Sequence, residues 1–258
     1  LPLVASQPFP DTTNVILFPH LGKVEAGGQT ESSAYSYGAD DEITDTETTV
    51  TGAKKSQAQK ISVEAMRFGG QYATLERYTR AAAEGMRRLL ASDFKTLFSS
   101  IATQVTATTT LTKDNLLDGR YNVVSSVKNA GLGPLVGMFD YKGMNEIAKE
   151  LTDTTATAFS NQVELGVLGT ARGGQPKGML FDITLFETDG LPTSGGDDIG
   201  CIWDTRNAFV AGIDGINGFN INIQPPLAAS PWWELFMWSF WHVAEHNDTA
   251  ACGVLSDT

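Results

Sequence analysis

The chain has 258 residues and 41% hydrophobic content, enough to bury the core of one large or two modest domains. With 18 Lys and Arg against 30 Asp and Glu, its net charge of −12 argues against a general nucleic-acid binder, because phosphate contacts need basic residues. No stretch approaches the roughly 20 apolar residues that span a bilayer. The most hydrophobic run, residues 232–243, is interrupted by Glu234, Ser239 and His242, so we expect no membrane segment.

The charges are distributed unevenly along the chain. Residues 24–53 contain seven acidic residues and no Lys or Arg. Residues 54–95 hold nine of the eighteen basic residues, which are Lys54, Lys55, Lys60, Arg67, Arg77, Arg80, Arg87, Arg88 and Lys95. Two solvated faces would explain this order, and so would a charge-complementary contact between neighbouring copies of the chain.

The first segment, residues 1–20, is predicted to be an extended arm, because its prolines remove amide donors and exclude a helix or a central strand. Residues 22–52 are rich in Gly, Ser, Thr and acidic residues, with turn-forming residues at 38–41. A long, poorly buried hairpin fits this composition. Disorder is the competing interpretation, because the segment has too little apolar surface to offset its ordering entropy unless another surface covers it.

A helical period begins near residue 71. Apolar residues recur mostly at steps of three or four, at Tyr72, Leu75, Tyr78, Ala82, Met86, Leu89, Leu97 and Ile101. The pattern predicts one amphipathic helix over residues 71–102, roughly 45 Å long. Gly85 lies in its interior, where glycine weakens a helix by about 1 kcal/mol relative to alanine, so we expect another element to pack closely there.

A second helix is expected to begin at Thr112 as its N-cap and to end near Asn129, with Gly131 after it. Beyond it, short apolar runs are separated by Gly, Pro and Asp, and a short helix over residues 142–151 interrupts them. The runs predict strands over residues 135–141, 163–168, 179–186, 199–203, 208–213, 219–223, 233–244 and 250–255. His246-Asn247-Asp248 is expected to join the last two.

The sequence His242-Val243-Ala244-Glu245-His246 matches the H-x-x-E-H pattern of a zinc peptidase family. In that family two histidines bind zinc from one face of a helix and the glutamate is the general base. The aromatic residues before the motif favour a strand that enters a turn instead. A strand would place the two histidines roughly 13 Å apart at about 3.3 Å per residue, so we expect no zinc site.

The sequence GTARGGQPKG, residues 169–178, combines glycines with Arg172 and Lys177 and so resembles a phosphate-binding loop. It lacks the G-x-x-x-x-G-K-[ST] spacing that directs backbone amides and the lysine at phosphate, and Pro176 removes one amide. The segment is therefore predicted to be a glycine-rich hairpin.

The remaining motifs suggest no chemistry. His20 lies in the predicted arm, and no serine or cysteine triad accompanies it. Asp197 and Asp198 follow a Ser-Gly-Gly sequence, where solvation explains two adjacent carboxylates. The glycosylation sequon at residues 247–249 has meaning only in a secreted protein. We accordingly expect no catalytic, cofactor-binding or metal-binding residues, no cofactor and no enzymatic activity.

Two features bear on the origin of the chain. Leu1 is not a residue that trimming of an initiator methionine normally exposes, which indicates a cleaved precursor or an incomplete chain. Cys201 and Cys252 lie far apart in sequence and form no metal-like cluster, so a reducing cytosol is the default compartment.

The last long predicted strand is unusually aromatic, with Trp232, Trp233, Phe236, Trp238, Phe240 and Trp241. Burial of both strand faces is one explanation. The other is a surface that faces a partner, since large aromatic side chains anchor interfaces.

The order of segments resembles the Hong Kong 97-type major capsid proteins of tailed bacteriophages. An arm, an acidic extended hairpin, a long helix, a mixed domain of short strands and a terminal return follow one another. The resemblance is carried by QYATLERYTRAAAEGMRRLLASDFKTLF, LVGMFDYKGMNEIAKEL, VLGTARGGQPKGMLFDITLFETDGLP and IGCIWDTRNAFVAGI. The third segment corresponds in that family to a glycine-containing turn, a strand and a loop ending in Leu-Pro.

The resemblance implies an α+β fold with an N-terminal arm, an extended β-hairpin loop, a long spine helix, and peripheral and axial domains. It divides the chain into an arm (1–23), an extended loop laid over a neighbouring subunit (24–62), a peripheral domain with the spine helix (63–130), an axial domain (131–225) and C-terminal strands returning to the peripheral domain (226–258). Some family members cross-link a loop lysine to a neighbour's asparagine. Lys54, Lys55 and Lys60 are available here, and no local motif selects one.

The implied function is self-assembly, as pentamers and hexamers, into the icosahedral shell of a double-stranded DNA phage. Scaffolding, portal and decoration proteins are the implied partners, the packaged DNA is bound without sequence specificity, no membrane is involved, and assembly takes place in the host cytoplasm. An encapsulin-like nanocompartment, which encloses cargo enzymes, is the alternative with the same fold. A zinc hydrolase using His242, Glu245 and His246, and an adhesive β-rich binding protein, are alternatives from other classes.

Overall fold

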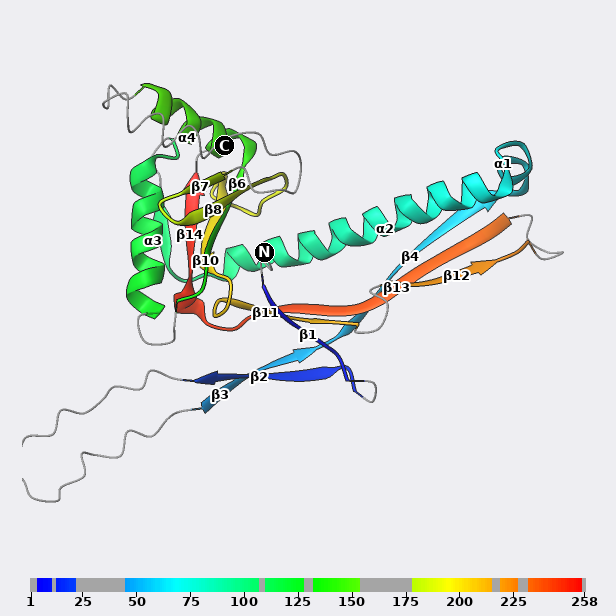
Figure 1. The fold of residues 1–258 in the computed structure, drawn as a ribbon, viewed down its shortest axis with the longest axis horizontal. Coiled ribbons are helices and arrows are strands. Elements are labelled where there is room, and N and C mark those ends of the chain that lie inside the picture. The colour runs from blue at the N-terminus through cyan, green and yellow to red at the C-terminus, as the bar shows by residue number, and fades with distance from the viewer. Residues whose placement is uncertain are drawn as a thin grey trace, which may run out of the picture.

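The computed structural model describes residues 4–10, 13–21, 45–106, 110–127, 132–153, 178–214, 219–226 and 232–256. They form a compact body and an elongated part (Figure 1). We call the elongated part the arm from here on; it is not the N-terminal arm expected over residues 1–23. In the arm, helix α2 (Gln71–Thr96) lies along a narrow sheet, and in the body helices α3 (Lys113–Val127) and α4 (Tyr141–Asp153) flank a second sheet. A ribbon of β2 (Val15–Leu21) and β3 (Asp45–Thr51) extends below the arm. The predicted α+β architecture is confirmed.

The arm sheet is built around one long strand, β13 (Trp232–Glu245). Along one edge β13 pairs over ten positions with β4 (Ala53–Ser62), and along the other it pairs with β11 (Phe209–Ile213) and β12 (Asn220–Gln224). Strand β1 (Ala5–Pro8) adds to β11 in parallel at the edge of the sheet, a position that tolerates proline. Residues 53–62 of the expected extended loop thus pair within the arm sheet.

Helix α2 covers the inner face of β13. The residues of α2 that face the sheet recur at steps of four, with Ala82, Met86 and Phe94 buried and Leu90 partly buried, and Phe98 of the following 3-10 turn continues the series. Ala82 and Met86 pack with Leu235, Met237 and Trp241 of β13. Leu89, expected on this face, is exposed, because a strict four-residue step places Leu90 there instead. The predicted helix is otherwise confirmed, with a 3-10 turn (Leu97–Ser100) completing it.

Gly85 lies where α2 crosses β4. A Cβ atom at this position would come within 2.4 Å of Oε1 of Gln57. The close packing expected at this glycine is therefore confirmed. Glycine has a lower helix propensity than alanine, and its missing side chain lets the helix approach the strand.

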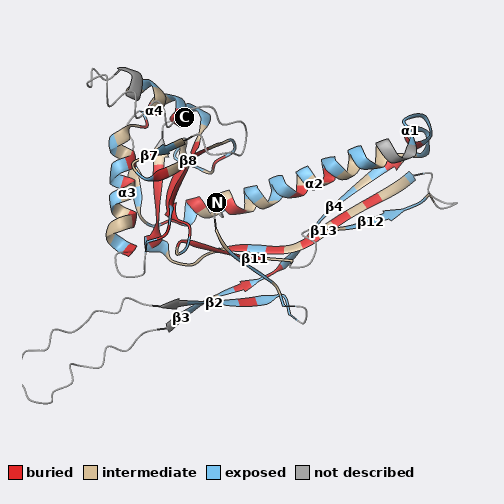
Figure 2. Cartoon of the chain, in the orientation of Figure 1, coloured by how far each residue is buried: buried red, intermediate tan, exposed pale blue. Residues whose placement is uncertain are grey.

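The body sheet contains the other strands. Its order is β5 (Gln104–Thr106), β14 (Ala251–Ser256), β10 (Asp197–Asp204), β6 (Leu135–Asp140), β8 (Ile183–Thr188) and β7 (Gly178–Leu180), with β9 (Thr193–Ser194) paired to β10. The buried residues concentrate in this sheet and at its contact with α2 (Figure 2).

Helix α3 covers one face of the body sheet. Its mid-helix residue Gly119 allows this close approach, since a Cβ atom there would lie 2.8 Å from Cδ1 of Ile202. Thr112 caps the helix as predicted, its hydroxyl accepting the amide of Asn115 at 3.4 Å. The predicted helix over residues 142–151 is confirmed as α4, and its Glu146 carboxylate accepts the Leu111 amide at 2.7 Å.

Two strand predictions need correction. The run at residues 179–186 is two strands, because Phe181 and Asp182 both adopt positive φ and close a tight hairpin between β7 and β8. The two final strands do not form a common return, since β13 lies in the arm sheet and β14 lies between β5 and β10 of the body sheet. The predicted strand at 163–168, the C-cap Gly131 and most of the acidic hairpin, residues 24–44, lie outside the described residues.

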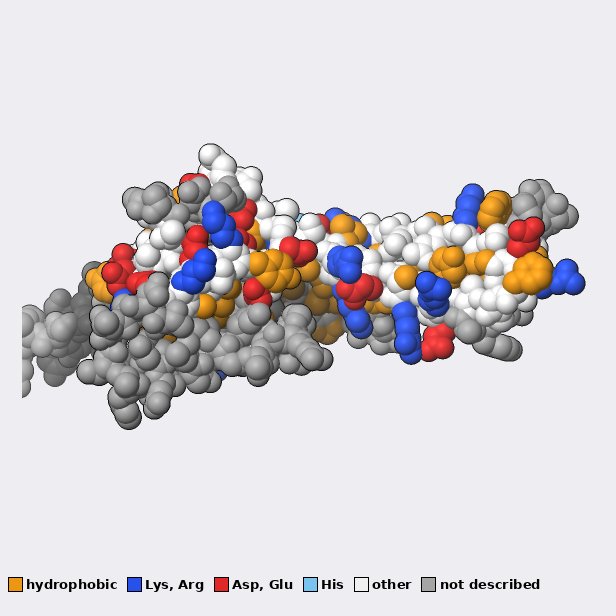
Figure 3. Space-filling model, turned by 90° about the horizontal axis from the view of Figure 1, so that it is seen from above, with side chains coloured by type: hydrophobic (Ala, Val, Ile, Leu, Met, Phe, Trp, Pro, Cys, Tyr) orange, Lys and Arg blue, Asp and Glu red, His pale blue; other side chains and the backbone are white. Residues whose placement is uncertain are grey.

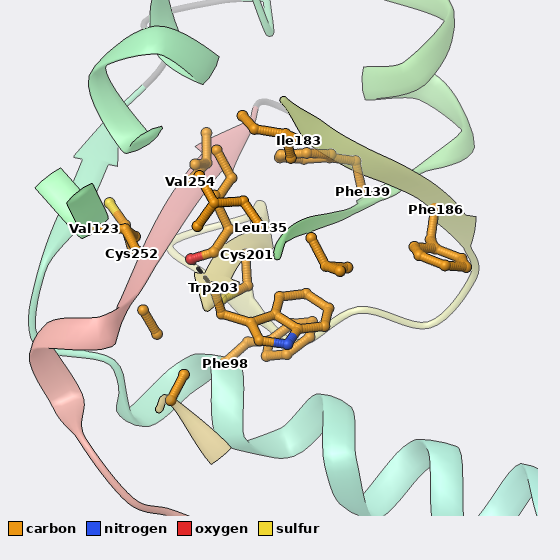
Figure 4. Close-up of a cluster of buried hydrophobic side chains, with 14 of the residues drawn as sticks. Phe98, Val123, Leu135, Phe139, Ile183, Phe186, Cys201, Trp203, Cys252 and Val254 are labelled. Carbon is orange, nitrogen blue, oxygen red and sulfur yellow. Dashed lines mark hydrogen bonds between the residues drawn. The ribbon is translucent and has the colours of Figure 1, made fainter. Parts of the chain in front are cut away.

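An aromatic cluster joins the arm to the body. Trp203, at the end of β10, has its ring centroid 5.5 Å from Phe94, 5.6 Å from Phe98 and 6.0 Å from Phe209. These four residues come from the body sheet, the end of the long helix and the arm sheet. Trp203 is fully buried among them (Figure 4). We call this cluster the joint.

Candidate functional site

The zinc-like motif lies on a strand, as predicted. His242 and Glu245 belong to β13, His242 is exposed, and His246 directly follows the strand. The ring nitrogen Nδ1 of His246 is 2.9 Å from the hydroxyl of Thr48 in the β2–β3 ribbon. Among the described residues no group of three potential ligands could hold a metal ion. The geometry required for zinc catalysis is therefore not formed by this motif.

Glu245 is a structural carboxyl between the arm and the body. Its Oε2 accepts the Ser100 hydroxyl at 3.1 Å, and in the part of the chain that the structure describes no hydrogen-bond partner reaches its buried Oε1. Burial raises the pKa of Glu245 above its ordinary value of 4.5, and the neighbouring Asp248 raises it further, while the bond from Ser100 opposes the change.

Glu245→Gln is expected to stabilise the protein increasingly as the pH rises from acid toward neutrality. An acid whose folded-state pKa is raised contributes stability below its unfolded pKa and loses it as the pH rises through the folded pKa. The amide keeps an acceptor for Ser100 and does not ionise. Urea unfolding at a series of pH values measures the effect, and a difference between variant and parent that does not change with pH would contradict it.

The two cysteines are buried structural residues. Cys201 and Cys252 are both free and fully buried in neighbouring strands. Cys252 stands opposite Ile202, so Cys201 points to the other face of the sheet and the pair is not placed for a disulfide. Burial raises the pKa of both thiols, which disfavours the reactive thiolate.

The other sequence motifs also have structural roles. Asp197 and Asp198 do not lie in a solvated loop as expected; they begin β10 and pair with β9. Partial burial raises the pKa of Asp198, with Asp140 adding to the shift and Lys142 opposing it. Asn247, in the sequon, caps a short 3-10 turn (Asp248–Ala250) by accepting the Thr249 amide at 3.1 Å. His20 lies in β2, and residues 169–177 of the glycine-rich segment lie outside the described residues.

A cavity of about 420 Å³ lies between α2, β1, β11 and the body. Apolar side chains form most of its wall, and the polar residues of the described lining are Ser6, Arg87, Lys95 and Thr188. Lys95 is held by hydrogen bonding to the backbone carbonyl of Asp189.

The aromatic strand is buried on one face only. Trp241 and the residues in phase with it lie beneath α2. The alternate residues Phe236, Trp238 and Phe240 are half-buried on the face away from α2, and Trp232 is 42% exposed. Complete burial of both faces is therefore wrong. A row of partly exposed aromatic residues is the kind of surface that a protein partner covers.

The chain is similar to known proteins in its fold and not in its sequence. No protein-family model matches the sequence, and no curated protein matches it. Among solved structures, the capsid of Ralstonia phage GP4 aligns with a TM-score of 0.72 at 9% identity, covering 99% of this chain and 87% of that chain. The capsid of cyanophage P-SCSP1u aligns with a TM-score of 0.68 at 10% identity, covering 99% and 87%.

The chain has the Hong Kong 97-type capsid fold. The holo-SrpI encapsulin complex from Synechococcus elongatus PCC 7942 shares it, with a TM-score of 0.69 at 10% identity over 99% of this chain and 86% of that chain. In all three comparisons the alignment spans the arm and the body. The Hong Kong 97-type fold expected from the sequence is thus confirmed.

Within this fold the three candidate loop lysines all lie on β4 and contact other residues. Lys54 stands over the Trp238 ring, 5.5 Å from its centroid. Lys55 pairs with Asp93 at 3.1 Å, and Lys60 pairs with Glu234 at 3.7 Å. None of them is distinguished as a cross-linking residue. Further basic side chains lie along the arm of this Hong Kong 97-type fold (Figure 3).

Sequence reasoning missed the turn that connects the two sheets of the Hong Kong 97-type fold. Asp204 is completely buried, and its carboxylate accepts the amides of Gly133 at 2.9 Å and Arg206 at 2.8 Å and the side-chain amide of Asn207 at 2.8 Å. An Asp directly after an apolar strand, with Asn three residues later, is the available signal for such a turn.

Proposed function

We propose that the chain is a major capsid protein that self-assembles into the icosahedral shell of a double-stranded DNA phage. The supporting observation is the fold shared with phage capsids over 99% of the chain, both in the two capsids described above and in the capsid of bacteriophage PhiM1. The partly exposed aromatic face of β13 adds physical support, since a subunit of a closed shell buries such surfaces against neighbouring copies.

The arm would be the peripheral domain, with α2 as its spine helix, and the body would be the axial domain of each capsomer. The boundaries expected at residues 63–130, 131–225 and 226–258 would need adjustment under this proposal. Helix α3 packs on the body sheet, and β14 pairs within it, so both elements belong with the body. Residues 24–44 would lie over a neighbouring subunit, whose surface would supply the cover that their composition requires.

Copies of the chain would assemble as pentamers and hexamers in the host cytoplasm, with scaffolding, portal and decoration proteins as further partners. The net charge of −12 suits a shell that does not bind the packaged DNA tightly, since DNA must move during filling. The role is structural, without enzymatic activity. Among the described helices none is long and apolar enough to cross a bilayer.

Electron microscopy of the purified protein tests the proposal. Expressed alone or with a scaffolding protein, it is expected to yield capsomers and closed shells. A stable monomer under every assembly condition, with no capsomers and no shells, would overturn the proposal.

An encapsulin-like shell is the second candidate, because the holo-SrpI encapsulin complex shares the fold with a TM-score of 0.69. The contents of purified particles discriminate the two. Double-stranded DNA inside native particles supports the phage capsid, whereas a stoichiometric protein cargo without DNA supports the nanocompartment.

A further inference from the structure

The most exposed large apolar side chain of the described residues lies at the far end of the arm. Phe68 is 85% exposed and is the last residue of α1 (Val63–Phe68), the short helix that turns the chain from β4 into α2. A phenylalanine exposed to this degree does not contribute the free energy that its burial would give. Packing within the isolated chain does not bury it. A surface of this kind indicates a contact made outside the subunit.

The position of Phe68 is fixed by the structure around it. Ser62 caps α1 by accepting the Ala65 amide at 3.0 Å, and Met66 is buried beneath the helix with 4% exposure. The Gly69 amide bonds the Ala65 carbonyl at 2.9 Å, and a Cβ atom on Gly69 would lie 2.6 Å from the Thr74 hydroxyl. The backbone that carries Phe68 is therefore held by these contacts, and the side chain is directed outward.

Two further partly exposed apolar side chains lie on the elements at this end of the arm. Val63, at the start of α1, is 39% exposed. Trp232, 42% exposed, pairs across the sheet with Ser62, the residue that caps the helix. Apolar, acidic and basic side chains lie close together at this end of the arm (Figure 3). We call the set Val63, Glu64, Arg67, Phe68 and Trp232 the tip patch.

The two charges of the tip patch make it complementary to itself. Glu64 and Arg67 are both exposed, and within the described part of the chain neither forms an ion pair or a side-chain hydrogen bond. By contrast, Glu76 and Arg80 pair within α2 at 2.7 Å. A surface that offers an apolar centre with one charge of each sign fits a second copy of the same surface.

We propose that the tip patch is a contact between arms of neighbouring copies, in which Phe68 is the apolar anchor and Glu64 of one copy pairs with Arg67 of the next. This proposal rests on the proposed shell function and names the residues of one of its contacts. Buried aromatic anchors surrounded by polar groups carry most of the binding energy at protein interfaces. A small contact of this kind gains strength by repetition over the shell.

The first test replaces the anchor. Phe68→Asp is expected to reduce the yield of shells at least roughly tenfold, because it removes the apolar contact and places carboxylates together. Phe68→Leu, which keeps an apolar side chain, should retain most of the yield. Thermal unfolding of the unassembled protein should be unchanged in both, since the side chain is exposed. Shells formed by Phe68→Asp at the parent yield would overturn the proposal.

The second test uses the charges and separates a contact between copies from one within a chain. Glu64→Arg alone and Arg67→Glu alone are each expected to lower the shell yield roughly tenfold through like-charge repulsion. A one-to-one mixture of the two variants should recover shells, because tip patches with two positive charges then meet tip patches with two negative charges. Failure of the mixture to exceed either variant alone would overturn the pairing of Glu64 with Arg67.

Whether the parent protein forms shells distinguishes failure of the tip contact from failure of the shell function. Parent shells together with insensitivity to Phe68→Asp overturn the tip contact and leave the shell function intact. If the parent forms no shells, the shell function fails. The same variants are then compared by sedimentation of the soluble protein. Oligomers that form in the parent and are lost in Phe68→Asp support the tip contact. A parent that forms no oligomers overturns it.

Discussion

Trp203→Ala is expected to lower the free energy of unfolding by about 3–5 kcal/mol, the largest effect of any single change considered. Trp203 is fully buried, and its ring lies within 6.0 Å of the rings of Phe94, Phe98 and Phe209. These partners come from α2, the 3-10 turn after it and β11, so the cavity would open where the arm meets the body. The surrounding elements belong to two sheets and cannot collapse together to fill it.

Urea or thermal unfolding of the unassembled protein measures this effect. Trp232→Ala is the matched control, because it removes the same side chain from a site that is 42% exposed, and it should cost about 1 kcal/mol or less. Equal losses for the two variants would show that Trp203 does not hold the joint together.

Asp204→Ala is expected to cost about 2–4 kcal/mol, because it leaves three hydrogen-bond donors of a partly buried turn without their acceptor. The donors are the amides of Gly133 and Arg206 and the side-chain amide of Asn207. This turn carries the chain from β10 of the body sheet to β11 of the arm sheet. Its loss should therefore weaken the orientation of the arm as well as the stability of the body.

Chemical denaturation of the purified variant tests this prediction. Asp204→Asn should lose less than Asp204→Ala, since it keeps one carbonyl acceptor of the same shape. Asp197→Ala, at the half-buried start of the same strand, is a control expected to change stability by about 0.5 kcal/mol. A loss for Asp204→Ala no larger than that control would contradict the role assigned to its carboxylate.

The long helix and most strands could be predicted from the sequence because their signals are local. The apolar period from residue 71 onward requires a helix with one buried face, and the N-cap Thr112 marks the start of α3. The local pattern wrongly placed Leu89 on the buried face of the helix. Steps of three and of four residues both fit a helix, and only the packing against β13 shows that Leu90 lies on that face. It also missed the hairpin at Phe181 and Asp182, where phenylalanine gives no turn signal.

The candidate surfaces were only partly visible in the sequence. The aromatic content of residues 232–241 indicated burial or a partner, and strand alternation alone could not say which face α2 covers. Phe68 carries no signal at all, since an apolar residue at the end of a short helix is ordinarily buried. Its exposure depends on the corner between α1 and α2, which directs Met66 inward and Phe68 outward.

The sequence by itself determined the types of most elements, because these depend on periodicity and residue chemistry along the chain, and the order of its segments resembles that of the Hong Kong 97-type fold. Tertiary structure alone decided that β13 and β14 enter different sheets, that Asp204 and the aromatic joint connect those sheets, and that Phe68 faces outward. Such pairings join residues far apart in sequence, and their free energy depends on packing that no local pattern records.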